Sequence, residues 1–398
     1  MNVGASSNPA SCDPAACDAD VVVVGGGPAG LAAAIAVARQ GLHVEVIDAM
    51  KPPIDKACGE GLLPGSLESL SALGFDLKHD LDQAESSVLR GVRFIGDSSS
   101  SNHYTTIQAA FPAGPGATPG RGIRRTALHQ LLLDRAASLG VRFHWENNVR
   151  SIETNNKIAV VHTNNKTVRA RYLIGADGHQ SRIATWAGLS TGVIRSRRIG
   201  LRQHYTIASW SRFVEIYWSD RGQAYVTPIS ATEVCVAFVT RKKFSGTDHA
   251  LRHFPALQRH LVGAHPSGPA RGSITLGRTL RHVTSGNIAL IGDASGSVDA
   301  ITGEGLALGF RQAAALAPAL KANDLAAYQR AHRRIQRLPA LMSRSLLLMD
   351  RSPRLRDRAL NTLQHNPWLF DRLLRLHIGR SPSHLFRADD LLQPDYTC

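Results

Sequence analysis

The stretch that decides the fold is Val21-Val22-Val23-Val24-Gly25-Gly26-Gly27-Pro28-Ala29-Gly30, an apolar run that ends in a glycine-rich turn. An alanine-rich segment of helical character, Leu31 to Gln40, follows it, and a second apolar run, Val44 to Ile47, ends at Asp48. Strand, Gly-x-Gly-x-x-Gly turn, helix, strand and terminal acid in this order form the βαβ fingerprint of a dinucleotide site. A bare glycine triplet also suits a flexible loop, but the flanking elements favour the dinucleotide interpretation.

The residues of this turn have separate physical roles. Gly25 permits the tight turn, Gly27 lets the backbone approach a pyrophosphate, and Gly30 lets the helix pack close to its strand. The helix begins at Pro28-Ala29, where unpaired N–H groups favour the negative charge of a pyrophosphate. Asp48 is placed to accept hydrogen bonds from a ribose diol. The pattern predicts a dinucleotide without deciding which one.

Composition sets the class of protein. The chain has 398 residues, 43% hydrophobic and 19% charged, which is typical of one large or two closely connected globular domains. The formal net charge is +15 and is carried mainly by arginine spread along the chain. No nucleic-acid-binding motif accompanies this charge, so we expect no nucleic-acid partner; the basic surface suits an anionic cofactor or an anionic membrane. No apolar run approaches the roughly 20 residues of a membrane-spanning helix.

Cysteine usage and the N-terminus indicate a cytoplasmic protein. The five cysteines, Cys12, Cys17, Cys58, Cys235 and Cys398, have neither zinc-site spacing nor the pattern of a disulfide framework. We therefore predict no metal site. Residues 1–18 lack the basic and apolar regions of a signal peptide, and we expect a disordered leader there. Nothing in the sequence indicates an oligomeric state.

The predicted fold class is α/β: a Rossmann-like nucleotide-binding domain with an inserted antiparallel β-sheet substrate domain and a C-terminal helical segment. The nucleotide-binding domain is discontinuous, since strand-like runs interrupt it. Its predicted parts are 19–190 and 272–320, with substrate-domain excursions near 75–120, and they enclose a β-rich substrate domain over 191–271.

The C-terminal region, 321–398, is rich in leucine and arginine. Helical spacing is expected, with Pro339, Pro353 and Pro367 dividing the segment into helices. One interpretation is a helical cap that buries its apolar face over the substrate pocket. The other is a basic amphipathic surface that contacts an anionic membrane and draws a lipophilic substrate from it.

Two further apolar runs end in a similar way. One ends in Gly175-Ala176-Asp177-Gly178, and the other ends in Gly292-Asp293 and is followed by Gly303-Glu304-Gly305. A strand end of this kind offers N–H groups for phosphate oxygens and a carboxylate for a sugar hydroxyl. An aspartate that only caps a helix is the alternative for either one alone.

The three motifs in this order resemble the FAD-dependent oxidoreductases related to p-hydroxybenzoate hydroxylase, over most of the chain from Asp20 to about Leu320. Within this class the sequence is most similar to the geranylgeranyl reductase family. Lys56-Ala57-Cys58-Gly59-Glu60-Gly61-Leu62 resembles that family's Lys-x-Cys-Gly-Gly-Gly-Leu loop, and the segment from Gly292 to Gly305 resembles its Gly-Asp-Ala-Ala-Gly…Thr-Gly-Glu-Gly segment.

The resemblance implies FAD as cofactor, with NADPH or NADH as electron donor. Arg125 is proposed as an FAD contact because Arg125-Thr126-Ala127-Leu128 matches the Arg-x-x-Leu of the class, and its neighbour Arg124 is a rival for that role. The implied cofactor-binding residues are Gly25, Gly27, Pro28, Ala29, Gly30, Asp48, Arg125, Asp177, Gly292, Asp293, Gly303 and Gly305.

The chain departs from the family at four places. Glu60 replaces a glycine, and Ala300 stands where the family usually has proline. After Asp177-Gly178 the usual Ser-x-x-Arg is absent, because Ser181 is followed directly by Arg182. The segment Ala224 to Pro228 lacks the tryptophan and phenylalanine of the family's substrate motif, so the substrate cannot be taken from the family.

The leading functional hypothesis is a flavoprotein monooxygenase that uses NAD(P)H and O2 on an apolar aromatic or polyketide-like small molecule. The first alternative is reduction of the C=C bonds of an isoprenoid, and the second is a flavin-binding protein without catalysis. Cys58 is a candidate redox or proton-relay residue, although a structural role in the loop is favoured. Glu60 is a candidate polar group near the substrate, and a solvated loop carboxylate is the simpler interpretation.

Overall fold

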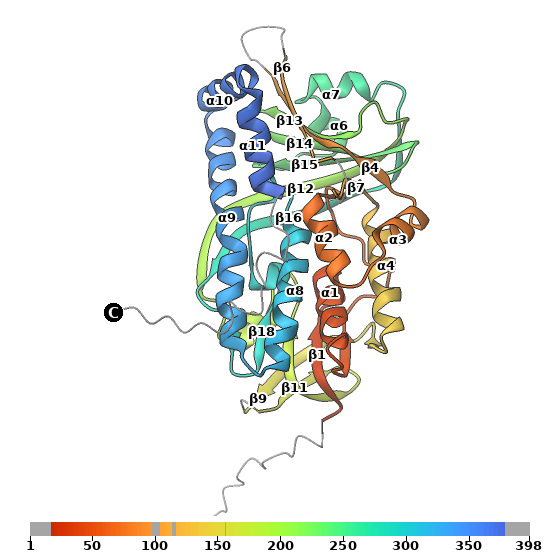
Figure 1. Cartoon of the computed structure of the whole chain (residues 1–398), viewed down its shortest axis with the longest axis vertical. Helices are drawn as coiled ribbons and strands as arrows, with labels where there is room; N and C mark the ends of the chain where they lie inside the picture. Colours follow the sequence, from red (N-terminus) through yellow and green to blue (C-terminus); the bar gives the residue numbers. More distant parts are fainter. Residues whose placement is uncertain (1–16, 98–103, 114–116, 156, 379–398) are drawn as a thin grey trace, which may run out of the picture.

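The computed structural model describes residues 17–97, 104–113, 117–155 and 157–378. The predicted leader, 1–18, lies almost entirely outside the described residues, as does the chain beyond 378. The molecule is elongated, with one sheet at each end of its long axis and helices along one side (Figure 1).

The first sheet carries the nucleotide-binding fingerprint. Its strands lie in the order β17 (Thr284–Ser285), β18 (Ile288–Leu290), β11 (Thr167–Gly175), β1 (Ala19–Val24), β2 (Val44–Ile47) and β8 (Arg142–His144), and β10 (Ala159–Thr163) pairs with both β11 and β9 (Val149–Thr154). The five strands from β18 to β8 are parallel. Both faces of such a sheet are covered, which explains why the valines of β1 are buried in an unbroken run.

The register of this sheet brings the three sequence motifs together. Val24 at the end of β1 is level with Gly175 of β11, and Gly175 is level with Leu290 of β18. The glycine turn, the Asp177 strand end and the Asp293 strand end therefore meet at one edge. Helix α1 (Pro28–Ala38) rises from this edge and packs between α8 (Gly305–Lys321) and α4 (Arg125–Ser138).

The second sheet forms the other end of the molecule. Its order is β19 (Gly296–Ser297), β16 (His265–Leu280), β12 (Gly192–Thr206), β15 (Glu233–Thr240), β14 (Gly222–Pro228), β13 (Phe213–Ser219), β5 (Gly91–Asp97) and β6 (Tyr104–Ala110). The pairs are antiparallel, as predicted for the insert, except that β13 and β5 run parallel. The excursion expected near 75–120 therefore supplies two strands to this sheet.

The predicted boundary of the substrate domain at 271 is too early. Strand β16 continues to Leu280, which pairs with Gly192 at the start of β12. Because the two strands pair along this whole length, residues 272–280 belong to the second sheet and not to the nucleotide-binding domain. A small third sheet of β3 (Gly61–Leu62), β7 (Gly120–Gly122) and β4 (Ser87–Leu89) lies beside α2 (Pro64–Ala72).

The C-terminal region is helical over its described part. Helix α9 (Leu325–Arg351) runs along one side of the molecule, and α10 (Pro353–His365) and α11 (Pro367–Ile378) pack against β6 of the second sheet (Figure 1). Pro353 and Pro367 begin helices, as predicted. Pro339 does not divide the segment: it is buried inside α9, whose packing against α8 compensates for the lost backbone hydrogen bond. In the described part of the chain, every helix is too short or too polar to cross a membrane.

Candidate active site

A cavity of about 670 Å³ joins the edge of the first sheet to the second sheet and the C-terminal helices. All of the predicted cofactor-binding residues except Gly30 line it. Those residues are Gly25, Gly27, Pro28, Ala29, Asp48, Arg125, Asp177, Gly292, Asp293, Gly303 and Gly305. Residues of all three sequence motifs therefore line one cavity.

The three glycines of the turn differ in what surrounds them. Gly25 has φ +113°, a conformation that favours glycine. A Cβ on Gly30 would overlap the carbonyl oxygen of Gly25, which explains why Gly30 packs inside the turn and does not line the cavity. A Cβ on Gly27 would meet no described atom within 4 Å. The turn thus leaves open space where a pyrophosphate would approach, as the cofactor requires.

Side chains hold the turn from behind. The buried ring of His129, on α4, lies with Nε2 2.9 Å from the carbonyl oxygen of Gly26. Burial lowers the pKa of His129, so the ring stays neutral and Nε2–H can donate to that oxygen. Asp48 accepts the N–H groups of Gly26 at 2.6 Å and Met50 at 2.7 Å. A carboxylate has about four acceptor positions, so Asp48 can still accept from a ribose diol.

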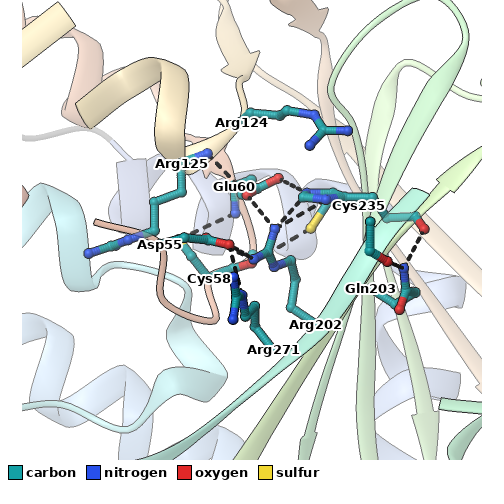
Figure 2. Close-up of polar contacts among 12 residues, drawn as sticks. Asp55, Cys58, Glu60, Arg124, Arg125, Arg202, Gln203, Cys235 and Arg271 are labelled. Atoms are coloured by element: carbon teal, nitrogen blue, oxygen red, sulfur yellow. Dashed lines mark hydrogen bonds and ion pairs between the residues drawn. The ribbon is translucent and has the colours of Figure 1, made fainter. Parts of the chain in front are cut away.

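The structure separates the two arginine candidates at the start of α4 (Figure 2). Arg124 Nε donates to Glu233 Oε2 at 2.8 Å, and its Nη2 also binds Glu233. Arg124 does not line the cavity, whereas Arg125 does. The Nε of Arg125 is buried and has no hydrogen-bond partner among the described residues. Of the two arginines, Arg125 is therefore the one that lies at the cavity.

The structure shows one of the two roles that the sequence left open for Asp177. Its Oδ2 accepts the N–H groups of Arg182 at 2.8 Å and Ile183 at 3.1 Å, at the start of α5 (Arg182–Trp186). Its Oδ1 is buried and meets no donor in the described part of the chain. The Asp293 side chain is more exposed to solvent, and its Oδ2 lies 3.5 Å from Lys56 Nζ. Asp177 thus holds the first turn of α5 through Oδ2, and the residue also lines the cavity.

Buried side chains that the sequence did not single out support the short helix η2 (Gly292–Ser295). Gln312 Oε1 accepts the N–H of Gly292 at 2.7 Å, and His332 Nε2 lies 2.9 Å from the hydroxyl oxygen of Ser295. Burial lowers the pKa of His332 to about 4. His332 comes from α9, so the C-terminal region holds the cofactor side of the cavity as well as covering the substrate side.

The loop before α8 is fixed by the second sheet. Asp299 Oδ1 accepts the N–H of Ile301 at 2.9 Å, and Tyr225 donates its hydroxyl to the carbonyl oxygen of Ile301 at 2.7 Å. Tyr225 belongs to the segment that lacks the family's substrate motif, and it anchors this loop instead. Gly303 has φ +69°, and a Cβ there would meet no described atom within 4 Å.

The prediction that Glu60 is a solvated loop carboxylate is wrong. Glu60 is only 2% exposed, and Oε1 accepts the N–H of Arg125 at 3.0 Å. Its Oε2 lies 2.6 Å from His204 Nε2, and Arg202 Nη1 is 3.4 Å from Oε1. The reason is long-range: Arg202 and His204 lie on the same face of β12 and come to the loop only in the folded chain.

We call Asp55, Glu60, Arg202, His204 and Cys235 the Glu60 cluster. Arg202 Nη2 donates to both oxygens of Asp55 at 2.8 Å, and Arg271 Nε donates to Asp55 Oδ2 at 3.1 Å (Figure 2). Burial acts to raise the pKa of Asp55, but the two guanidinium groups hold it below its usual range. Asp55, unlike Glu60 and Arg202, does not line the cavity.

Cys58 lies beside this cluster and lines the cavity. Its sulfur accepts the N–H of Glu60 at 3.5 Å, and its carbonyl oxygen lies 3.6 Å from Cys235 Sγ. Burial raises the pKa of the Cys235 thiol well above its usual range. These contacts shape the loop before β3, in keeping with the structural role favoured for Cys58, and its chemical role stays a prediction.

Comparisons with known proteins agree with the geometry. The sequence model of the FAD binding domain family matches residues 18–331. Menaquinone reductase of Mycolicibacterium smegmatis is 31% identical over 318 residues, 73% of this chain and 73% of that protein. Ubiquinone hydroxylase UbiL of Rhodospirillum rubrum is 29% identical over 328 residues, 76% and 72% of the two chains. Digeranylgeranylglycerophospholipid reductase of Thermoplasma volcanium is 27% identical over 309 residues, 72% and 74%.

Among solved structures, p-nitrophenol 4-monooxygenase PnpA of Pseudomonas putida superposes with a TM-score of 0.76 at 17% identity, over 91% of this chain and 98% of that chain. This likeness shows the fold. The resemblance to p-hydroxybenzoate hydroxylase-like proteins and to the geranylgeranyl reductase branch is confirmed, and the relatives do not support the hypothesis of a flavin-binding protein without catalysis. The chain therefore belongs to the FAD binding domain family and is an FAD-dependent oxidoreductase.

Proposed function

We propose that the protein is a monooxygenase that uses FAD, NADPH or NADH, and O2 to hydroxylate a lipophilic aromatic molecule. The observation that carries this proposal is the single cavity that joins the cofactor-side residues to apolar walls. When bound, FAD supplies electron transfer and activation of O2. The protein's part is to place the substrate beside the flavin and to exclude water.

The cofactor side supplies the groups that would hold FAD. The N-terminus of α1 and the open backbone at Gly27 suit the pyrophosphate, and Asp48 suits a ribose. Arg125 offers a charged donor, and the loop at Gly303 offers backbone without side chains. Each of these groups is assigned from its position at the cavity and from its hydrogen-bonding chemistry.

The opposite walls are apolar. They come from the second sheet and from the C-terminal helices, and include Val92, Phe94, Val214, Ile216, Phe238, Leu346, Met349, Leu363, Phe370 and Leu374. Such walls bind a lipophilic molecule and keep water from a reactive centre. Polar side chains also line this side, among them Glu60, Arg202, Thr227 and His377, and they suit a substrate with an oxygen-bearing ring better than a plain hydrocarbon chain.

Reduction of an isoprenoid C=C bond is the second candidate. The loop from Lys56 to Leu62 and the similarity to menaquinone reductase favour it. Both candidates share reduced FAD and an apolar cavity, and they differ in what the substrate gains. Hydroxylation adds one oxygen atom from O2, whereas reduction adds two hydrogen atoms and needs no O2.

The test uses the FAD-loaded protein with NADPH or NADH and two probes, menaquinone with a short isoprenoid tail and a prenylated phenol. Mass spectrometry of the products under ¹⁸O2 distinguishes the candidates. We expect labelled oxygen in the phenol product. A product with two added hydrogens, formed equally well without O2, would replace the proposal with the reductase. Failure of both nucleotides to reduce the flavin would contradict the choice of electron donor.

We also propose that the protein contacts an anionic membrane at its C-terminal helices, to take up a lipophilic substrate. Exposed apolar side chains there include Leu341, Leu348, Leu355, Trp368 and Leu376. Exposed arginines alternate with them, such as Arg344 and Arg372, which is the composition of an interfacial helix. Co-sedimentation with phosphatidylglycerol vesicles is expected, and a Trp368→Ser variant should bind them less. Equal sedimentation with neutral and anionic vesicles, or none, would contradict this.

A further inference from the structure

A buried carboxylate and a buried ring face each other where the loop before α8 meets the end of α11. Glu304, the residue before α8, is 3% exposed, and its side chain makes no hydrogen bond to the first turn of that helix. Its Oε2 lies 3.4 Å from Nδ1 of His377, in the last turn of α11. Neither atom has a hydrogen-bond partner among the described residues. Because an unpaired buried polar atom is unfavourable, the pair points to a shared proton.

The other ring nitrogen of His377 decides which atom can donate. Nε2 lies 3.2 Å from the carbonyl oxygen of Thr302, which can only accept, so Nε2 carries a proton. In the neutral ring Nδ1 is then an acceptor, and it faces an oxygen of Glu304 that is also an acceptor when the carboxyl group is ionised. Two such acceptors repel each other. One proton between Glu304 and His377 satisfies both.

The charged groups around Glu304 do not replace this proton. Arg311 on α8 approaches it, but Nη1 is 3.9 Å from Glu304 Oε1, which is too far for a hydrogen bond. Arg311 also acts on Glu68 of α2, and Arg334 of α9 lines a small cavity beside Glu304. Burial raises the pKa of Glu304, although the charges of His377 and Arg311 act to lower it. The net effect of the surroundings favours the protonated carboxyl group.

The pair lies between solvent and the cavity of about 670 Å³, which we call the main cavity. Glu304 and His377 line the small cavity, whose volume of about 20 Å³ exceeds the roughly 10–15 Å³ that one water molecule needs. Exposed Leu376 also lines it, so it borders the surface. His377 and Thr302 line the main cavity, so their hydrogen bond joins two residues of its wall.

Both candidate reactions consume a proton in the main cavity. Hydroxylation converts R–H, O2, NADPH and H⁺ to R–OH, NADP⁺ and water, so the oxygen atom that leaves as water must gain a proton. Reduction of a C=C bond adds the hydride of NADPH and one H⁺. Apolar walls cover the substrate side of this cavity, and they exclude the water that would otherwise supply the proton. A protein group is therefore needed as the donor.

We infer that His377 is a general acid that donates a proton to the leaving oxygen atom in the main cavity, and that Glu304 is the positioning residue that holds its ring. The inference rests on the proposed function. The N–H bond at Nε2 breaks, an O–H bond forms on the leaving oxygen, and the electron pair stays on Nε2. The shared proton settles on Nδ1, where ionised Glu304 accepts its hydrogen bond. Solvent restores the lost proton before the next turnover.

The first experiment asks whether the pair holds a proton, and it uses the FAD-free protein. Since burial raises the pKa of Glu304, stability falls as the pH rises through the folded-state pKa. Glu304→Gln keeps a donor beside Nδ1 and does not ionise. The unfolding equilibrium constant of the natural protein, divided by that of Glu304→Gln, should rise several-fold between about pH 4.5 and pH 7. A constant or falling ratio would indicate an ordinary ion pair and overturn the inference.

The second experiment asks whether His377 donates the proton, and it uses the FAD-loaded protein with NADPH or NADH, O2 and the prenylated phenol. His377→Ala should lower kcat about 100-fold, with KM and FAD affinity within about twofold. Added imidazole should restore at least about a tenth of the lost rate, which a purely structural role would not allow. The control is His365→Ala, because His365 is exposed on α10 and lines neither cavity; it should keep kcat.

Unchanged kcat in a folded, FAD-loaded His377→Ala variant would overturn the inference, as would a loss of kcat that imidazole does not restore. If His377→Ala fails to fold, His377→Gln replaces it, since its amide can still donate to the Thr302 carbonyl oxygen. Absence of turnover by the natural protein would count against the proposed function, and the stability ratio would still test the pair. The two proposals can thus fail separately.

Discussion

The cofactor side and the substrate side of the cavity are built in different ways. On the cofactor side, the decisive groups are backbone atoms of three strand ends that the parallel register makes level. On the substrate side, they are side chains from distant segments: Glu60 and His204, which meet at 2.6 Å, are 144 residues apart. Short sequence motifs encode the first kind of site because glycine positions fix backbone geometry. They do not encode the second.

If the cofactor side depends on backbone geometry, the largest effect on stability should come from one methyl group added to the glycine turn. Gly30→Ala would place a Cβ on the carbonyl oxygen of Gly25, so we expect the free energy of unfolding to fall by about 3 kcal/mol. Chemical denaturation of the FAD-free protein measures this. Gly27→Ala is the matched control and should stay within about 0.5 kcal/mol, because its Cβ has open space. Equal loss in both would contradict the comparison.

Open space at Gly27 should matter only when the cofactor binds. Gly27 has φ −71° and ψ 175°, which valine adopts easily, so Gly27→Val should fold normally. Its side chain would occupy the approach of the pyrophosphate, and we expect FAD affinity to fall about 100-fold, or about 2.7 kcal/mol. Fluorescence titration with FAD gives the dissociation constant. Unchanged affinity would show that the pyrophosphate lies elsewhere.

The same contrast, between local backbone geometry and contacts from distant segments, explains which features the sequence could predict. The elements around the turn were predictable because local periodicity and glycine positions determine them: α1 spans Pro28–Ala38, where helical character is predicted from Leu31 to Gln40. The parallel pairing of β5 with β13 was not, because strand partners far apart in sequence leave no local signal. The prediction that Pro339 divides the C-terminal segment failed for a related reason, because tertiary packing keeps α9 continuous through this residue.

For the site, the sequence indicated the three strand ends that meet at this edge of the cavity and missed the side chains that hold them. His129, Gln312 and His332 are ordinary helix residues until the fold places them behind the turn and η2. One signal for the substrate side was present: Glu60 in place of the family's glycine. Its meaning depended on Arg202 and His204, whose contacts with the loop arise only in the folded chain.

The cofactor side also depends on long-range side chains, and His332 gives a way to measure one of them. Burial gives His332 a folded-state pKa of about 4, below the usual 6.5, so the unfolded chain binds more protons between these values. Stability is therefore lost as the pH falls from about 6.5 towards 4. At pH 5 the loss attributable to His332 is about 2 kcal/mol. The difference in unfolding free energy between the natural protein and His332→Gln should shrink by that amount between pH 7 and pH 5. A constant difference would mean that His332 does not titrate in this way.

The smallest predicted effect separates two neighbours, because Arg124 and Arg125 are adjacent in sequence but face different partners. Arg124 is engaged by Glu233 outside the cavity, whereas the Nε of Arg125 is unpaired and the residue lines the cavity. Arg125→Ala should weaken FAD binding about tenfold, since one charged hydrogen bond contributes about 1.5 kcal/mol. Arg124→Ala, the control, should change FAD affinity less than about twofold and lower stability by at most about 1 kcal/mol, because its ion pair is partly exposed. FAD titration and denaturation of both variants give the two numbers. The reverse result would assign the cofactor contact to Arg124. It would also mean that the ion pair between Arg124 and Glu233 opens when FAD binds. The cofactor side would then depend on a side-chain rearrangement and not on preformed backbone geometry alone.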